Sequence, residues 1–271
     1  MATIAQPKGV LVDLTKCIGC RSCQIACKSW NGRSVKKTVQ NGTFTNPVDM
    51  NSEAYTVVKF VETEKDNMIS SWDFIKTQCM HCKDPACVSA CPVGAFEKKP
   101  NGPVNYISER CIGCRYCMMA CPFNVPKYEW EKISPIVQKC TFCSDRQEEG
   151  LPPACVKACA PKALYFGNYD DVVAEAERRI KENPGKYVDH IYGKDEAGGT
   201  SWMYISGVPF EQLGFKTNIP NVALPTLSWA MLKTIPMKVG GLITILAAIA
   251  YIRNRGNSGG GSASSKNEKE G

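Results

Sequence analysis

The cysteines are the residues of this sequence that could carry chemistry, because all sixteen fall into four runs of four. The runs are Cys17, Cys20, Cys23 and Cys27; Cys79, Cys82, Cys87 and Cys91; Cys111, Cys114, Cys117 and Cys121; and Cys140, Cys143, Cys155 and Cys159. The first and third runs follow the spacing C-x2-C-x2-C-x3-C, and the second and fourth runs lengthen the middle gap to four and eleven residues. Every run keeps a C-x2-C pair and a final C-x3-C pair.

This spacing is typical of iron–sulfur ligation. Two intervening residues let a tight turn aim three thiolates at three irons of one cubane, while the fourth cysteine points away and usually binds a second cluster. Disulfides are disfavoured, because two residues are too few for ordinary bridges and the N-terminus shows no secretory signal. Zinc binds C-x2-C pairs too, but tetrahedral zinc sites seldom use such triplets. We therefore expect four [4Fe–4S] clusters, one for each of the four runs.

An internal repeat identifies two further residues of these sites. The segment CIGCR occurs identically at 17–21 and 111–115, and short-gap runs alternate with long-gap runs along the chain. Gly19 and Gly113 lie in the repeated turn, where we expect a positive φ angle and an amide aimed at sulfur. Both glycines are predicted to be cofactor-binding residues.

The charge of the chain does not indicate nucleic-acid binding. Its formal net charge is +7. Each [4Fe–4S] core with four thiolates carries about −2, so four clusters bring the protein close to neutrality. We expect no nucleic-acid partner.

Hydrophobic patterning predicts short strands around the runs and one amphipathic helix. Strands are predicted over residues 8–15, 54–62, 103–108 and 163–169 and within 198–210, and a helix over 170–182. The polar stretch 34–71 is predicted to be a hairpin insertion.

The C-terminal part has the composition of a membrane anchor. Residues 230–252 are apolar except for Lys233 and Lys238, which can snorkel towards headgroups. We predict a transmembrane helix over 229–253; the alternative is an amphipathic helix that packs on a partner or lies at the interface. The tail, 254–271, is rich in Gly, Ser, Lys and Glu and is predicted to be disordered.

Nearly the whole chain resembles the iron–sulfur (beta) subunit of membrane-bound respiratory formate dehydrogenases. The four ferredoxin-type runs, the polar insertion and the single C-terminal apolar helix carry this resemblance. The stretch GGTSWMYISGVPFE is also similar to the iron–sulfur subunit of quinone-reducing nickel–iron hydrogenases. In respiratory nitrate reductases the corresponding subunit lacks one third-run cysteine, whereas Cys114 is present here.

The resemblance implies the fold class α+β, with two interleaved, two-cluster, bacterial-ferredoxin-like domains and one C-terminal transmembrane helix. Residues 1–33 with 134–170 would form the first ferredoxin-like domain, 34–71 the insertion, 72–133 the second domain and 171–228 a post-cluster segment. It also implies crossed ligation: cluster one uses Cys17, Cys20, Cys23 and Cys159; cluster two Cys140, Cys143, Cys155 and Cys27; cluster three Cys79, Cys82, Cys87 and Cys121; and cluster four Cys111, Cys114, Cys117 and Cys91.

The expected function is electron transfer rather than the making or breaking of covalent bonds in a substrate. All sixteen cysteines are expected to be cluster ligands, so no cluster iron is left open to a substrate. We expect no catalytic residue; His81 is expected at the surface, although it could bond to sulfur, and His190 has no predicted role. A structural cluster protein and a radical enzyme are less consistent with these motifs.

The resemblance implies partners at both ends of the electron path. They are a molybdopterin formate dehydrogenase subunit, and a membrane cytochrome b or other quinone-reactive subunit. The alternative is an electron-transfer subunit that serves a periplasmic nickel–iron hydrogenase or another molybdopterin oxidoreductase. The expected location is the bacterial cytoplasmic membrane. The cluster domains are expected on the periplasmic face by co-export with a signal-bearing partner, with the cytoplasmic face as the alternative.

Overall fold

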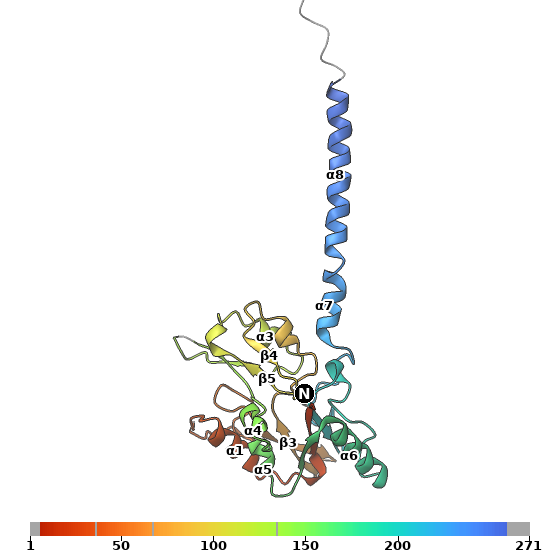
Figure 1. Cartoon of the computed structure of the whole chain (residues 1–271). Coiled ribbons are helices and arrows are strands. Elements are labelled where there is room, and N and C mark those ends of the chain that lie inside the picture. The colour runs from red at the N-terminus through yellow and green to blue at the C-terminus, as the bar shows by residue number, and fades with distance from the viewer. Residues whose placement is uncertain (1–5, 36, 67, 134, 259–271) are drawn as a thin grey trace, which may run out of the picture. The chain divides into compact units, whose positions relative to one another are not determined.

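The computed structural model describes residues 6–35, 37–66, 68–133 and 135–258 (Figure 1). The chain divides into two units, Met1–Pro225, which holds every cysteine, and Thr226–Gly271. Helices and strands are mixed in the first unit, as the predicted α+β class requires.

A three-stranded sheet lies in the core of the first unit. Its strands are β1 (Lys8–Asp13), which is central, β8 (Leu164–Asn168), which is antiparallel to it, and β9 (Trp202–Ile205), which is parallel to it. β1 is apolar on both faces because both faces are covered. Val10 and Val12 pack with Trp202, while Leu11 belongs to a separate apolar cluster. The three strands predicted from the sequence for these regions are confirmed.

Helix α6 (Tyr169–Glu182) covers the Leu11 side of this sheet. Val172 and Ala176 lie one turn apart and are completely buried against it. Two acidic residues open the helix and Arg179 and Lys181 lie in its last turn, which complements the helix dipole. The helix predicted over 170–182 is confirmed.

The longest hairpin joins β2 (Val57–Lys65) to β3 (Met68–Thr77), antiparallel to each other. It confirms the predicted strand over 54–62 and adds a second strand. β3 extends past residue 71 to Thr77, because Ile75 is buried and Thr77 still pairs with Val57. The hairpin therefore continues into the segment that the sequence assigned to the second ferredoxin-like domain.

Smaller elements surround the cysteine runs. Two short hairpins are formed by β4 (Phe96–Lys98) with β5 (Val104–Tyr106), which confirms the strand predicted over 103–108, and by β6 (Lys127–Tyr128) with β7 (Val137–Gln138). The short helices are η1 (Leu14–Lys16), α1 (Ser22–Trp30), α2 (Ala86–Ser89), η2 (Ser108–Arg110), α3 (Tyr116–Ala120), α4 (Ser144–Glu148), α5 (Ala154–Lys157) and η3 (Glu196–Gly198). α1 packs against α5, and α2 packs against α3.

The C-terminal unit is helical. α7 (Leu224–Leu232) is followed by α8 (Ile235–Ser258). Together, over Leu224–Arg255, they are long and apolar enough to cross a membrane by length and composition. The disordered tail predicted from residue 254 is wrong for 254–258, because α8 continues there and Arg255 in its last turn complements the helix dipole. Residues 259–271 lie outside the described residues.

A buried ion pair fixes the end of β1 just before the first cysteine run. Asp13 is completely buried and accepts hydrogen bonds from Arg179 Nη1 at 3.0 Å, Tyr187 Oη at 3.0 Å and Thr15 Oγ1 at 2.7 Å. Removing Asp13 leaves Arg179 Nη1, Tyr187 and Thr15 without their shared buried acceptor, although Arg179 keeps a second partner, Glu175, at 2.7 Å. Hydrogen bonds to a charged, buried group are costly to lose, so we expect Asp13→Ala to lower the free energy of unfolding of the first unit by about 3 kcal/mol.

Anaerobic urea titration of the cluster-loaded protein measures this effect as a lower midpoint of unfolding. The control is Glu182→Gln, which removes an exposed partner of Arg178 on the same helix. Exposed pairs contribute little, so this control should leave the midpoint unchanged. Equal midpoints for wild type and Asp13→Ala would contradict the prediction.

Candidate cluster sites

The C-x2-C turns of the four runs share one backbone feature. The residue before the second cysteine has a positive φ angle in each: 67° at Gly19, 49° at His81, 71° at Gly113 and 57° at Phe142. The positive φ predicted for the two glycines is confirmed. The same conformation at His81 and Phe142 was missed, although aligning the four runs places these residues at the same position.

The backbone conformation favours glycine at both positions, and at Gly19 the packing of the Phe74 ring excludes a side chain as well. A Cβ atom at Gly19 would lie 2.7 Å from Cδ1 of Phe74 in β3, and one at Gly113 would lie 2.9 Å from Oη of Tyr128 in β6. Real Cβ atoms do not approach other atoms this closely. The two hairpins therefore each place an aromatic ring against one CIGCR turn.

His81 and Phe142 place their own rings in the interior. His81 is completely buried and Phe142 is 1% exposed, and their ring centroids are 5.0 Å apart. The expectation that His81 lies at the surface is wrong, because its left-handed turn directs the ring into the core. This contact joins a turn of the second run to a turn of the fourth run.

The surroundings of His81 define its protonation. Nδ1 accepts a hydrogen bond from the backbone N–H of Val104 at 2.9 Å, which places the proton on Nε2. Burial, and then the nearby Lys139 and Lys98, hold the pKa of His81 well below its usual range. Nε2 is buried and has no hydrogen-bond partner among the described residues. A neutral imidazole therefore presents an unpaired N–H beside the cysteine runs.

His190 also has a partner that the sequence did not indicate. Its Nε2 lies 2.7 Å from Oε1 of Glu196, and Glu196 is buried and accepts from the backbone N–H of Gly193. This contact closes the loop before β9 and involves no cysteine.

Backbone amides point at several cysteine sulfurs. Such bonds are Gly113 N to Cys111 Sγ at 3.4 Å, Phe142 N to Cys140 Sγ at 3.3 Å, Ala95 N to Cys91 Sγ at 3.2 Å and Val125 N to Cys121 Sγ at 3.5 Å. N–H to sulfur hydrogen bonds stabilise thiolates and tune the reduction potential of a bound cluster.

The burial of thiols and their mutual repulsion show which cysteines lie close together. Burial raises the pKa of Cys23 to about 12, and the nearby Cys155, Cys17 and Cys159 add to the rise. Burial likewise raises the pKa of Cys143 to about 12, with contributions from Cys155 and Cys27. In these two sites, cysteines of the first and fourth runs are neighbours.

The second and third runs are related in the same way. Burial raises the pKa of Cys87 to about 12, and Cys79 and Cys121 contribute to the rise. Burial raises the pKa of Cys117 to about 11, together with Cys111, Cys114 and Cys91. The last cysteine of each of these two runs therefore lies beside the other run.

Three apolar clusters connect these groups of thiols. Cys155 shares one cluster with the adjoining Cys23 and Cys159. A second cluster contains Cys27, Cys79 and Cys140, with Cys121 packed against it. A third contains Cys117, with Cys87 and Cys91 packed against it. Each of these apolar clusters therefore brings together thiols from different runs.

These residues fit iron–sulfur clusters better than single metal ions. In the described part of the chain, no three His, Cys, Asp or Glu side chains converge closely enough to hold one ion. A cubane instead binds its four thiolates at four separate irons. The amide bonds to cysteine Sγ stabilise the thiolate form that a cubane requires. Bound there, the clusters would supply one-electron redox chemistry.

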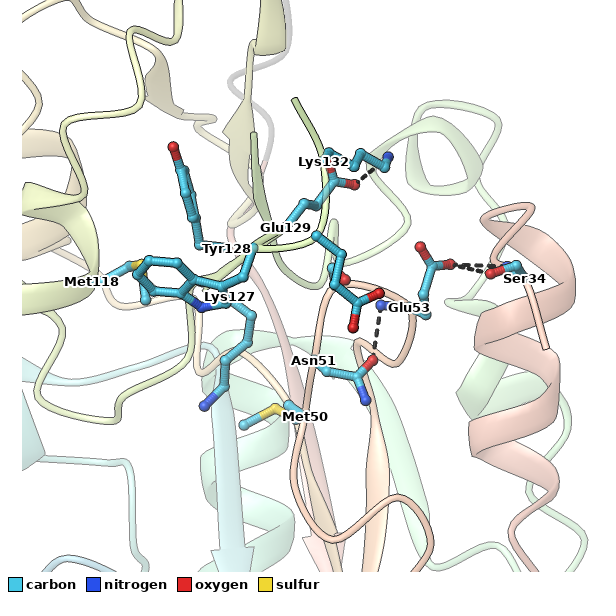
Figure 2. Close-up of a pocket in the computed structure, with 12 residues that line it drawn as sticks. Ser34, Met50, Asn51, Glu53, Met118, Lys127, Tyr128, Glu129 and Lys132 are labelled. Carbon is cyan, nitrogen blue, oxygen red and sulfur yellow. Dashed lines mark hydrogen bonds and ion pairs between the residues drawn. The ribbon is translucent and has the colours of Figure 1, made fainter. Parts of the chain in front are cut away.

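The pocket of Figure 2 has no thiol in its lining, although two of its residues, Met50 and Met118, pack against the apolar clusters that contain cysteines. It has a volume of about 450 Å³ and contains no cysteine, and its carboxylates already have partners. Glu53 accepts from the backbone N–H and Oγ of Ser34 at 3.0 and 2.9 Å, and Glu129 pairs with Lys132 at 2.8 Å. These interactions stabilise the loop conformation around the pocket.

Comparison with known proteins agrees with this donor set. Residues 16–95 and 70–169 each match a family model described as a 4Fe-4S dicluster domain. The chain is 36% identical over 235 residues to the Hydrogenase-2 operon protein HybA of Escherichia coli, covering 76% of this chain and 71% of that protein. This chain belongs to the 4Fe-4S dicluster family of iron–sulfur subunits. The predicted [4Fe–4S] cofactor is confirmed, and two dicluster domains support four clusters.

Other members of this dicluster family are longer than the present chain. A protein of Nitratidesulfovibrio vulgaris is 45% identical over 251 residues, which cover 90% of this chain and 65% of that protein. The nitrate-inducible formate dehydrogenase iron-sulfur subunit of Escherichia coli is 40% identical over 200 residues, which cover 72% of this chain and 66% of that subunit. The resemblance to formate dehydrogenase and hydrogenase iron–sulfur subunits is thereby confirmed.

Proposed function

We propose that this chain is an electron-transfer subunit that passes single electrons through four [4Fe–4S] clusters between a catalytic subunit and a quinone-reactive membrane subunit. The observation that carries the proposal is the series of thiols linked by three apolar clusters. A chain of adjoining redox centres moves electrons without breaking bonds or transferring protons.

The ligand sets follow the crossed pattern. Cluster one takes Cys17, Cys20, Cys23 and Cys159; cluster two Cys140, Cys143, Cys155 and Cys27; cluster three Cys79, Cys82, Cys87 and Cys121; and cluster four Cys111, Cys114, Cys117 and Cys91. Four pairs of thiols that raise one another's pKa support these sets: Cys159 with Cys17, Cys27 with Cys143, Cys121 with Cys87, and Cys91 with Cys117. The contacts of α1 with α5 and of α2 with α3 support them as well. Gly19 and Gly113 serve clusters one and four through their turns.

The same contacts support two ferredoxin-like domains built from distant segments. Residues 1–33 with 134–170 hold clusters one and two, and 72–133 hold clusters three and four. The contact between the tilted rings of His81 and Phe142 joins clusters three and two across the boundary between these domains.

Exposure supports a path whose ends, clusters one and four, are more accessible than its middle. The residue after the first cysteine of the turn is 61% exposed in cluster one (Ile18) and 66% exposed in cluster four (Ile112). At the same position in the turns of clusters three and two, Met80 is 4% exposed and Thr141 is half-buried. The ends of the path are accessible to partners, whereas its middle is insulated by protein.

The partner at the cluster-one end is proposed to be the catalytic subunit of a formate dehydrogenase. The formate dehydrogenase iron-sulfur subunits, at about 40% identity, support this assignment. The alternative is a hydrogenase, which the similarity to HybA supports at 36% identity. Another molybdopterin oxidoreductase would fit the same wire.

The partner at the cluster-four end is proposed to be a membrane cytochrome b or another quinone-reactive subunit. The apolar residues 224–255 support anchoring in the bacterial cytoplasmic membrane. The cluster domains are proposed to lie on the periplasmic face, with the cytoplasmic face as the alternative.

Iron analysis of the anaerobically purified protein tests the proposal. We expect about sixteen iron atoms and about sixteen acid-labile sulfides per chain, because four cubanes each contain four irons. Chemical assay of both elements, with zinc measured in parallel as the control, gives these ratios. Zinc in place of iron would refute the proposed wire.

A further inference from the structure

Lys76 is a buried cation inside the first unit. It lies in β3 and is 2% exposed. Its Nζ donates a hydrogen bond to Oε1 of Gln78 at 2.6 Å and lies 4.1 Å from the ring centroid of Trp202. Gln78 Nε2 in turn donates to Oη of Tyr204 at 2.6 Å, and Oη donates back to the carbonyl oxygen of Lys76 at 3.0 Å. This closed network holds the ammonium in one place.

No carboxylate compensates this charge. In the described ranges, 6–35, 37–66, 68–133 and 135–258, no Asp or Glu forms an ion pair with Lys76. A buried, unpaired charge is strongly destabilising unless other groups of opposite sign lie near it. The face of Trp202 and one amide oxygen offset only part of that cost.

The groups near Lys76 that become negative when clusters are bound are cysteines of two proposed clusters. Lys76 pairs with Val58 across the hairpin, and the backbone N–H of Val58 donates at 3.2 Å to Oε1 of Gln24, which lies in α1 between Cys23 and Cys27. Cys23 belongs to the cluster-one set and Cys27 to the cluster-two set.

Apolar packing independently places Lys76 at this junction. Trp202, beneath its ammonium, belongs to the apolar cluster that contains Cys155 of the cluster-two set. Cys23 and Cys159 of the cluster-one set pack against that same cluster. The cation therefore lies beside the step between clusters one and two.

We propose that Lys76 is a positioning residue that sets the reduction potentials of clusters one and two together. Each cluster gains one negative charge when it accepts an electron from its neighbour, and loses it when it passes the electron on. A fixed cation beside both clusters stabilises their reduced forms and so raises both potentials. This inference rests on the proposed four-cluster wire.

The decisive variant is Lys76→Met, which keeps the length of the side chain and removes its charge. An EPR-monitored redox titration of the four-cluster protein measures each potential, with signals assigned through cysteine-to-serine variants. For clusters one and two, we expect the ratio of reduced to oxidised cluster at a fixed potential to fall tenfold or more, which is about 59 mV for a one-electron couple. Lys76→Arg, which keeps the charge, should restore both potentials.

Lys98→Met is the matched control. Lys98 Nζ donates to the backbone carbonyl of His81, next to Cys82, at 3.4 Å and to that of Gly102 at 2.6 Å, so its charge lies beside the cluster-three set. This variant should lower the reduction potential of cluster three and leave the potentials of clusters one and two unchanged. Potentials of clusters one and two that do not move in Lys76→Met, or an equal shift of all four clusters, would overturn the inference.

A second variant covers the case in which Lys76→Met does not assemble its clusters. Should Lys76→Met lose iron, Lys76→Gln is titrated instead, since its amide can still donate to Gln78 without a charge. Unchanged potentials in that variant overturn the inference, and lowered potentials support it. A wild-type protein that holds fewer than four clusters would instead refute the proposed wire itself.

Discussion

Replacing Cys159 with serine is expected to change the cluster held by Cys17, Cys20 and Cys23 and to spare the one held by Cys140. Cys159 follows Cys155 by four residues, so a run that used its own four cysteines would show the opposite result. Burial raises the pKa of Cys17, and among the neighbouring thiols Cys159 contributes most to this rise. Serine is a harder ligand than cysteine, so cluster one should be lost or should shift to a lower potential.

EPR spectra of the reduced variant, with iron analysis in parallel, measure this effect. Cys27→Ser is the reciprocal control, because Cys27 lies in the first run but is proposed to bind cluster two. It should alter the EPR signal of the cluster bound by the Cys140 set and leave the EPR signal of the cluster bound by the Cys17 set unchanged. A Cys159→Ser protein that loses only the Cys140 cluster would disprove the crossed pairing.

The elements that position the clusters could be predicted where the sequence pattern is local. The strand before the first run, β8, β9 and α6 each carry a continuous or periodic apolar pattern in a short window. Gly19 and Gly113 were predictable because only glycine adopts positive φ without strain. The cysteine spacing identified the cofactor for the same reason, since each C-x2-C turn is a local structure.

The residues between clusters could not be predicted in this way, because their environment comes from distant segments. His81 was expected at the surface, yet its ring stacks on Phe142 and its Nδ1 binds the backbone of Val104. Lys76 is flanked by ordinary strand residues, and its burial depends on Trp202 and Tyr204, which lie far from it in the sequence. A polar residue in a short window gives no indication of such long-range contacts.

The strand at the end of the predicted hairpin insertion runs past residue 71 for a long-range reason. Polar composition ended the predicted insertion at residue 71, but Thr77 is fixed as a strand residue by pairing with Val57. This extension has a consequence for the site, because it carries Phe74 to Gly19 and Lys76 to the cysteines of the first run. Strand pairing, rather than composition, therefore joins the insertion to cluster one.

Deleting Thr226–Gly271 is expected to release the protein from the membrane while all four clusters remain. The cysteine ligands end at Cys159, and every core residue of the first unit precedes the deletion. The helices that are removed are exposed along their described length, and an apolar surface of this length is stable only in lipid or against another apolar surface.

Reduction of a soluble acceptor by the truncated complex should be unchanged, whereas quinone reduction should fall by about a hundredfold, because tethering to the membrane partner is lost. Both activities are assayed after detergent-free fractionation of membranes. Leu246→Lys should weaken membrane anchoring by a single substitution, since a charge near the centre of a transmembrane span costs about 3 kcal/mol. Leu246→Ala is the apolar control. A truncated protein that stays on the membrane and reduces quinone at the original rate would disprove the anchor. Loss of iron on truncation would instead mean that α7 and α8 stabilise the cluster fold.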